Sequence, residues 1–176
     1  YLCNMQAGDT VLASVKSKRM MHGDPAVLGR WSHIGLVAGG TGIAPLLQVA
    51  RVVLEEEGEP RTRVHLLSIN RHEEDILMRD DIDAMVAAHP GRFAVTYSLT
   101  GRPPPGWAGA TGRGDVALAS TALPPPSGDG KTQILVCGTD GFVATWGGPV
   151  GRAPKKPWPH GSKGGKVQGP LTGLLA

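Results

Sequence analysis

The feature that most constrains this chain of 176 residues is a glycine-rich turn, Gly39-Gly40-Thr41-Gly42-Ile43-Ala44-Pro45. It follows an apolar stretch, residues 34–38, that predicts a buried strand, and it opens an amphipathic pattern that predicts a helix to about Glu56. A strand that ends in glycines and leads into a helix brings free backbone N–H groups to the positive helix end. We expect Thr41 to cap this helix and Pro45 to lie in its first turn. The turn therefore indicates a site for an anion such as a phosphate.

The order of residues in this turn excludes two well-known phosphate motifs. The phosphate loop of NTPases requires a lysine after its last glycine, and none follows Gly42. The G-x-G-x-x-G dinucleotide fingerprint requires a third glycine where this chain has Leu46. Many α/β domains also use a glycine turn only to pack a helix closely against a sheet. Taken alone, the turn leaves both a nucleotide site and simple packing open.

Strand and helix patterns alternate along the rest of the chain. Strands are predicted at residues 63–69, 93–99 and 132–137, and a helix at 114–123. A further helix is expected after Asn70, which can cap it with a glutamate three residues on. The apolar stripe of that helix consists of Met78, Ile82, Met85 and Val86. This alternation predicts an α/β fold, with a parallel sheet covered by helices on both faces.

The four segments that follow the predicted strands share a composition. Residues 39–42, 68–71, 98–102 and 138–142 are all rich in glycine or in hydrogen-bonding side chains. In open parallel sheets, ligands bind beyond the carboxyl ends of the strands, where such segments meet. The shared composition therefore favours a nucleotide site over packing alone.

Composition excludes several other classes of protein. Cys3 and Cys137 are far apart and lack metal-ligand spacing, so neither a disulfide framework nor a zinc site is expected. The six histidines show no ligand spacing either, and no metal is predicted. Because no apolar run is long enough to span a bilayer and no signal segment opens the chain, we expect a soluble, intracellular segment. The sequence leaves open whether a membrane anchor precedes Tyr1.

The charge of the chain is uneven. Residues 141–176 contain no acidic residue. The basic residues of this stretch are Arg152, Lys155, Lys156, Lys163 and Lys166. Such a tail is either a solvated Gly/Pro-rich loop or a docking surface for an acidic partner, for example an electron-acceptor protein. Trp146 and Trp158 are too isolated to indicate nucleic-acid binding.

Several motifs, taken in order, resemble one family. They are Gly39-Gly40-Thr41-Gly42-Ile43-Ala44-Pro45, Leu66-Leu67-Ser68-Ile69-Asn70, Glu74-Asp75-Ile76-Leu77 with Arg79, Tyr97-Ser98-Leu99 before a proline loop and Trp107, and Leu135-Val136-Cys137-Gly138. Together they resemble the pyridine-nucleotide domain of NADH-cytochrome b5 reductases, which belong to the ferredoxin-NADP reductase superfamily. The resemblance implies a Rossmann-like three-layer domain that binds NADH or NADPH. It also implies hydride transfer to FAD, held by a neighbouring β-barrel, and electron transfer to a one-electron acceptor such as cytochrome b5.

The resemblance also implies roles for individual residues. Around the pyrophosphate and the nicotinamide it places Gly39, Gly40, Thr41 and Gly42, with Thr41 also near the flavin. Near the adenosine half it places Asn70, Ser98, Thr100 and Arg102. Facing the nicotinamide it places Cys137 and Gly138, followed by Thr139 and Asp140. Thr41 and Cys137 are thus the catalytic candidates, although Cys137 is equally compatible with a small packing residue at a strand end.

The chain departs from the family pattern at two places near the site. Thr100 stands where NADH-specific members carry an acidic residue, and Arg102 is close by. We therefore expect NADPH to be tolerated, unless Arg102 simply points into water. Asp140 follows Cys137-Gly138 where the family has prolines, and either caps the next helix or binds the carboxamide.

The expected domain organisation follows from the same resemblance. Residues 1–32 are assigned to the C-terminal edge of the flavin domain and its connection, and residues 33–176 to the NAD(P)H-binding domain. A basic Gly/Pro-rich insertion is expected at about 147–169. Because the family's FAD-binding motif is not in this chain, the chain alone is expected to hold FAD poorly and to be inactive. The alternatives are a non-catalytic nucleotide-binding or protein-interaction module, and a structural domain without a ligand.

Overall fold

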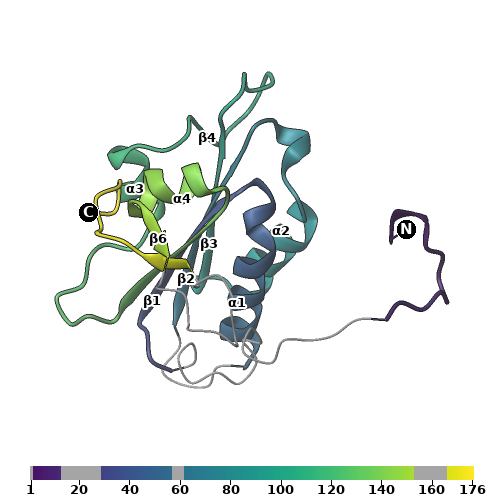
Figure 1. Ribbon diagram of the computed structural model, residues 1–176, viewed down its shortest axis with the longest axis horizontal. Helices are drawn as coiled ribbons and strands as arrows, with labels where there is room; N and C mark the ends of the chain where they lie inside the picture. Colours follow the sequence, from purple (N-terminus) through teal and green to yellow (C-terminus); the bar gives the residue numbers. More distant parts are fainter. Residues whose placement is uncertain (1, 13–28, 57–61, 153–165) are drawn as a thin grey trace, which may run out of the picture.

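The computed structural model describes residues 2–12, 29–56, 62–152 and 166–176. Its centre is a five-stranded parallel sheet with the order β4-β3-β2-β1-β5 (Figure 1). The strands are β1 (His33–Gly39), β2 (Arg63–Asn70), β3 (Phe93–Leu99), β4 (Ala110–Thr111) and β5 (Thr132–Cys137). Every pairing within this sheet is parallel, which confirms the predicted α/β class.

Helices cover both faces of the sheet, so the domain has three layers. On one face lie α1 (Ile43–Glu56) and α2 (Arg79–Ala88), and on the other lie α3 (Val116–Ala122) and α4 (Asp140–Gly147) (Figure 1). Short 3-10 turns occur at Leu2–Asn4 (η1), Gly40–Gly42 (η3) and Glu73–Asp75 (η4). The arrangement is the expected Rossmann-like one.

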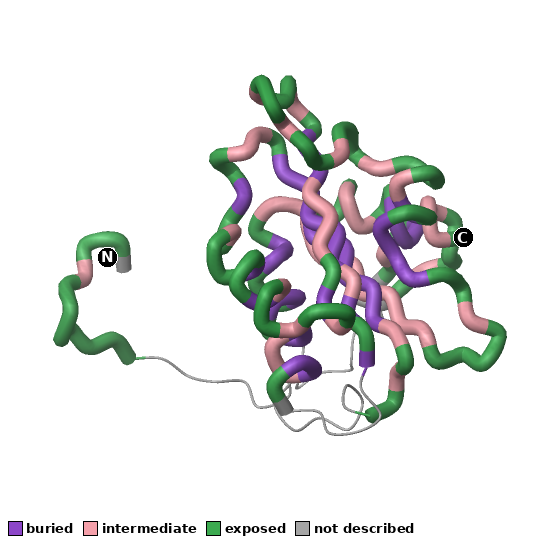
Figure 2. The backbone as a smooth tube through the Cα atoms, turned by 180° about the vertical axis from the view of Figure 1, so that it is seen from behind, coloured by how far each residue is buried: buried purple, intermediate pink, exposed green. Residues whose placement is uncertain are grey.

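The core consists of two clusters separated by the sheet. Successive side chains of a strand point to opposite faces, so Leu36 and Leu66 pack against α1 and α2, whereas Val37 and Leu67 pack toward α3 and α4. All four side chains are fully buried or nearly so. Figure 2 shows the buried segments concentrated in these central strands. The two-sided burial explains why β1 and β2 read as nearly continuous apolar runs.

The order in which successive strands are added to the sheet changes direction at β1. The chain leaves β1 through α1 to β2 on one side and later returns to β5 on the other side of β1. The connections at the carboxyl ends of β1 and β5 therefore diverge onto opposite faces. A crevice at this switch point is the usual ligand site of such sheets.

The helix predicted after Asn70 begins later than the sequence indicates. Asn70 is the last residue of β2 and is buried; the chain bends at Arg71 and His72, and His72 is the N-cap residue of η4 instead. The prediction that Asn70 caps a helix is therefore wrong. Met78 lies outside the stripe too, because it precedes α2 in a left-handed conformation (φ 57°) and is 42% exposed. Ile82 and Met85 are buried as expected.

The stretch at 147–169 begins and ends in a small ribbon. Strand β6 (Val150–Arg152) pairs antiparallel with β7 (Lys166–Gln168). The predicted basic residues Lys155, Lys156 and Lys163 lie outside the described residues, as does Trp158. The last residues return to α4, since the Leu174 and Leu175 N–H groups donate to the carbonyls of Thr145 and Trp146, both at 3.0 Å.

The first residues of the chain carry little regular structure. Within 2–12 the structure contains η1 and a turn closed by the Asp9 N–H on the Gln6 carbonyl at 3.0 Å. Val11 and Leu12 are exposed and form no strand, and residues 13–28 lie outside the described part. The assignment of residues 1–32 to a flavin domain stays a prediction.

Candidate nucleotide-binding site

A groove of about 860 Å³ lies where the carboxyl ends of β1, β2, β3 and β5 meet. Its walls include six of the residues named from the sequence: Gly39, Gly40, Thr41, Asn70, Thr100 and Thr139. The others are Ile69, Arg71, Glu74, Asp75, Leu77, Arg113, Gly141, Phe142 and Thr145. The strand ends that the sequence indicated thus converge on one cavity.

The glycine turn forms one end of this groove, and Gly39 and Gly42 in it leave no room for a side chain. Gly40 has a left-handed backbone (φ 52°), which glycine adopts at no cost. A Cβ on Gly42 would lie 2.2 Å from the Cys137 carbonyl oxygen, so the turn touches the end of β5 directly. Thr41 is exposed and lies within η3, not at the residue that precedes α1. The residue that precedes η3 is Gly39, which has no side chain to cap the turn. The predicted cap by Thr41 is therefore wrong, and its hydroxyl lines the groove instead.

Helix α4 forms a wall next to the glycine turn. Thr139 caps this helix, because its Oγ1 accepts a hydrogen bond from the Phe142 N–H at 3.3 Å. Capping by Asp140, one of the two roles expected for it, is wrong because Asp140 is already the first helical residue. Its carboxylate lies in the first turn, where negative charge interacts favourably with the helix dipole. The cap orients the first turn of α4, which contributes Gly141 and Phe142 to the groove.

The other end of the groove is built from the segments after β2 and β3. Asn70 is buried and its Nδ2 donates to Ser68 Oγ at 3.1 Å, while its carbonyl accepts from the Thr100 N–H at 2.9 Å. The Gly101 N–H donates to the Arg71 carbonyl at 2.8 Å. These bonds continue the sheet pairing by two residues and hold Thr100 at the groove.

Arginines enter this end of the groove from two segments. Arg71 follows β2, and Arg113 comes from the loop before α3. Arg71 was predictable only as part of a strand-end segment, and Arg113 was not predicted because it has no local signal. Arg102, which was expected near the adenine ribose, is exposed and does not line the groove.

Other predicted residues lie just beneath the groove rather than on its surface. Ser98 is fully buried, and its Oγ donates to the Gly112 carbonyl at 2.9 Å. Cys137 is half-buried and packs against the cluster under α1. A Cβ on Gly138 would lie 2.7 Å from the Phe142 ring. These residues shape the walls through packing.

The chemistry of the lining is suited to binding rather than to acid–base catalysis. None of the residues that line the groove is cysteine, histidine or lysine. Two acids, Glu74 and Asp75, accompany the two arginines, and the Asp75 carboxylate accepts from the His72 N–H at 3.0 Å. Among the described residues, no group of three or more potential metal ligands is present. The groove offers backbone N–H groups, hydroxyls and guanidinium groups to an anionic ligand.

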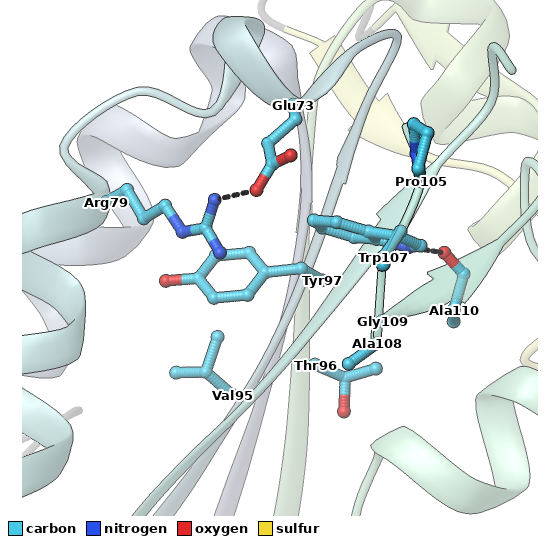
Figure 3. A pocket seen from close by; sticks show the side chains of 11 residues that line it. Glu73, Arg79, Val95, Thr96, Tyr97, Pro105, Trp107, Ala108, Gly109 and Ala110 are labelled. Atoms are coloured by element: carbon cyan, nitrogen blue, oxygen red, sulfur yellow. Dashed lines mark hydrogen bonds and ion pairs between the residues drawn. The ribbon is translucent and has the colours of Figure 1, made fainter. Parts of the chain in front are cut away.

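A second pocket, of about 620 Å³, lies beside β3 and is lined by charged and aromatic groups (Figure 3). The Arg79 guanidinium pairs with Glu73 and lies over two rings, 5.5 Å from the Tyr97 centroid and 5.8 Å from that of Trp107. The Tyr97 hydroxyl donates to Asp83 at 2.8 Å. Burial, followed by this bond, raises the pKa of Tyr97. These groups satisfy one another and fasten the proline loop to α2.

Comparison with known proteins assigns the domain. The family described as "Oxidoreductase NAD-binding domain" matches residues 36–146, which run from β1 to α4. The chain belongs to this family. In the part that the structure describes, no helix is both long and apolar enough to cross a bilayer.

The relatives are cytochrome b5 reductases and related enzymes. The chain is 35% identical to NADH-cytochrome b5 reductase 2 of Homo sapiens over 157 residues, covering 82% of this chain and 55% of that protein. It is 44% identical to a nitrate reductase [NAD(P)H] of Hordeum vulgare over 107 residues, covering 60% of this chain and 12% of that protein. The chain thus spans about half the length of the cytochrome b5 reductases that it matches.

A solved structure gives the same assignment. The cytochrome b5 reductase domain of Ulva prolifera nitrate reductase superposes with a TM-score of 0.60 at 32% identity, covering 64% of this chain and 42% of that one. The family resemblance and the Rossmann-like fold inferred from the sequence are confirmed.

Proposed function

We propose that this chain is the NAD(P)H-binding half of a flavin-dependent oxidoreductase of the cytochrome b5 reductase type. The observation that carries the proposal is the groove at the switch point, with a glycine turn in which side chains on Gly39 and Gly42 would collide with Phe142 and with the Cys137 carbonyl. The nucleotide donates a hydride to FAD, which is held mainly outside this chain. The electrons then pass to a one-electron acceptor such as cytochrome b5, inside the cell.

We assign each part of the nucleotide to a part of the groove. The backbone of Gly40 and Thr41 binds the pyrophosphate, while Asn70 and Thr100 lie on the adenosine side. The nicotinamide lies toward the end of β5, where Cys137 packs beneath it as a positioning residue. Hydride transfer is the chemistry of the cofactors themselves, so the protein supplies orientation and exclusion of water. This agrees with a lining that has no general base of the histidine or cysteine type.

Binding of the nucleotide to this chain is the direct test. Calorimetric titration with NADH is expected to show saturable binding at one site. Gly39→Val is expected to abolish it, because a Cβ at this position already lies 2.9 Å from the Phe142 ring. Heat signals without saturation in the parent chain would favour the structural domain without a ligand. Binding without turnover, once flavin domain and acceptor are supplied, would favour the non-catalytic module.

The adenosine end of the groove supports acceptance of NADPH as well as NADH. Thr100 brings no negative charge, and Arg71 and Arg113 line the same end, where their charges offset those of Glu74 and Asp75. Arginine is suited to phosphate because its planar fork donates two parallel hydrogen bonds. We therefore assign the contact with the 2′-phosphate to Arg71 and Arg113, in place of Arg102.

Two substitutions test this assignment. Thr100→Asp is expected to weaken NADPH binding about tenfold more than NADH binding, because the carboxylate repels the 2′-phosphate. Arg113→Ala is expected to lower NADPH affinity by a similar factor, whereas Arg102→Ala, outside the groove, serves as the matched control. A parent chain that binds NADPH at least about a thousandfold more weakly than NADH would contradict the assignment.

The acceptor is proposed to approach the basic end of the chain. Arg152 and Lys166 lie on neighbouring strands of the β6–β7 ribbon, in a stretch without acidic residues. An acidic acceptor would be attracted to a basic stretch of chain, and the association rate would fall as salt is added.

A further inference from the structure

The side chain of Phe142 occupies the junction of the two glycine-ended strands. Its ring atoms lie 2.9–3.1 Å from the position of a Cβ on Gly39 and 2.7–3.0 Å from that of a Cβ on Gly138. Glycine is therefore required at both positions, because the ring fills the space that a side chain would occupy. On its other side Phe142 approaches Trp146, with ring centroids 6.2 Å apart.

Phe142 is also part of the surface that a ligand would meet. It is half-buried, and it lines the groove next to the glycine turn. It is the only aromatic residue among the groove-lining residues that the structure describes, and its neighbours on that wall, Thr139 and Thr145, are polar. An aromatic face flanked by hydroxyls is suited to a planar ring that carries a polar substituent.

The two ends of the groove differ in a way that orients a dinucleotide. The charged side chains, Arg71, Glu74 and Arg113 among them, belong to segments after β2 and to the loop before α3. The end at β1 and β5 offers the glycine turn, threonines and Phe142, with no charged side chain in the lining of either segment. An uncharged planar ring is therefore better accommodated beside Phe142, and the phosphorylated adenosine at the other end.

We propose that Phe142 is the wall against which the nicotinamide ring packs, which makes it a positioning residue for hydride transfer. This inference rests on the proposed function, since it assigns one half of the dinucleotide to one end of the same groove. Contacts with Gly39, Gly138 and Trp146 hold the ring in place, and the half-buried side chain lines the groove. The same wall offers hydroxyls to the amide of the nicotinamide: Thr139 Oγ1 accepts from the Phe142 N–H at 3.3 Å and can still donate, and Thr145 Oγ1 donates to the Gly141 carbonyl at 2.9 Å and can still accept.

The test compares two probes on three versions of this chain. NADH contains the nicotinamide, and ADP-ribose lacks it but keeps the adenosine, the pyrophosphate and the second ribose. Phe142→Leu keeps an apolar side chain of the core but loses the flat face, and Phe142→Tyr keeps that face. We expect Phe142→Leu to weaken NADH about three- to tenfold and to leave ADP-ribose unchanged, with Phe142→Tyr close to the parent. Thermal unfolding of each variant reports whether the fold is retained.

The proton resonances of the nicotinamide provide a readout that a purely structural role would not change. A ring packed on Phe142 shifts the nicotinamide protons of bound NAD⁺ upfield, and this shift is expected in the parent and in Phe142→Tyr but not in Phe142→Leu. Equal losses for NADH and ADP-ribose, or no loss for either, would overturn the inference while the parent still binds both. If the parent binds neither probe, the proposed function itself fails.

Discussion

Gly42 shows how one residue joins the fold to the site. It is buried at the end of η3, and the carbonyl of Cys137 lies where its side chain would be. Glycine is required here by close approach rather than by its own backbone angle, because only Gly40 of this turn has a positive φ. The contact sets the distance between the glycine turn and the end of β5, and hence the width of the groove.

Gly42→Ala is expected to destabilise the domain by about 1–3 kcal/mol, because the new methyl must push β5 away from the turn. Nucleotide binding is expected to weaken as well, since the same shift moves the groove walls. Gly128→Ala is the matched control: it lies outside the groove lining, and a Cβ there meets nothing within 4 Å. Urea unfolding and calorimetry on both variants check this, and equal stability of the two would contradict it.

At the scale of elements, helix α4 decides how the groove is walled. It begins directly after the Cys137-Gly138 end of β5, and its first turn carries Phe142 to the glycine turn. The β6–β7 ribbon and the last residues then close on its far end. A helix of only eight residues depends on such contacts and on its cap, because its own propensity is too weak to hold it.

Thr139→Ala is expected to cost about 1 kcal/mol of stability, because it removes the bond to the Phe142 N–H. Nucleotide affinity should fall with it, since the first turn of α4 loosens. Thr139→Ser retains the oxygen and is expected to restore most of both quantities. Denaturant midpoints and NADH titrations measure the effect, and a serine variant as weak as the alanine variant would contradict capping as the cause.

At the scale of the whole molecule, the groove and a pair of histidines lie toward opposite ends of the sheet. The groove lies at the carboxyl ends of the strands, whereas His33 and His65 lie at the opposite end, with ring centroids 5.7 Å apart. His33 Nδ1 and His65 Nε2 are buried without a hydrogen-bond partner. Burial lowers the pKa of His65 from 6.5, and the nearby His33 and Arg63 lower it further.

This pair predicts a loss of stability in acid that is separate from the site. Because the folded state lowers the pKa of His65, the unfolded chain binds the proton more readily, and stability falls as the pH drops below about 6.5. Urea midpoints at about pH 7.5 and about pH 5 are expected to differ less in His65→Gln than in the parent chain. An identical difference in both would exclude His65 as a source.

The bounds of several strands were predictable because they depend on local pattern. The predicted strands at 93–99 and 132–137 coincide with β3 and β5, since apolar and β-branched runs between turn residues are a local signal. The caps were not predictable to the same degree. Asn70, Thr41 and Asp140 all have side chains suited to capping, yet each is placed by the path of the chain around it.

The sequence by itself determined the α/β class, the family and the strand ends that form the groove, because hydrophobic period and glycine position act over a few neighbouring residues. Only the tertiary structure decided which side chains enter the groove. It brought in Arg113 and Phe142, and it placed Ser98 and Arg102 outside the lining. The physical reason is that these positions depend on contacts between segments far apart in the chain, such as the Phe142 ring on Gly39, which no local pattern encodes.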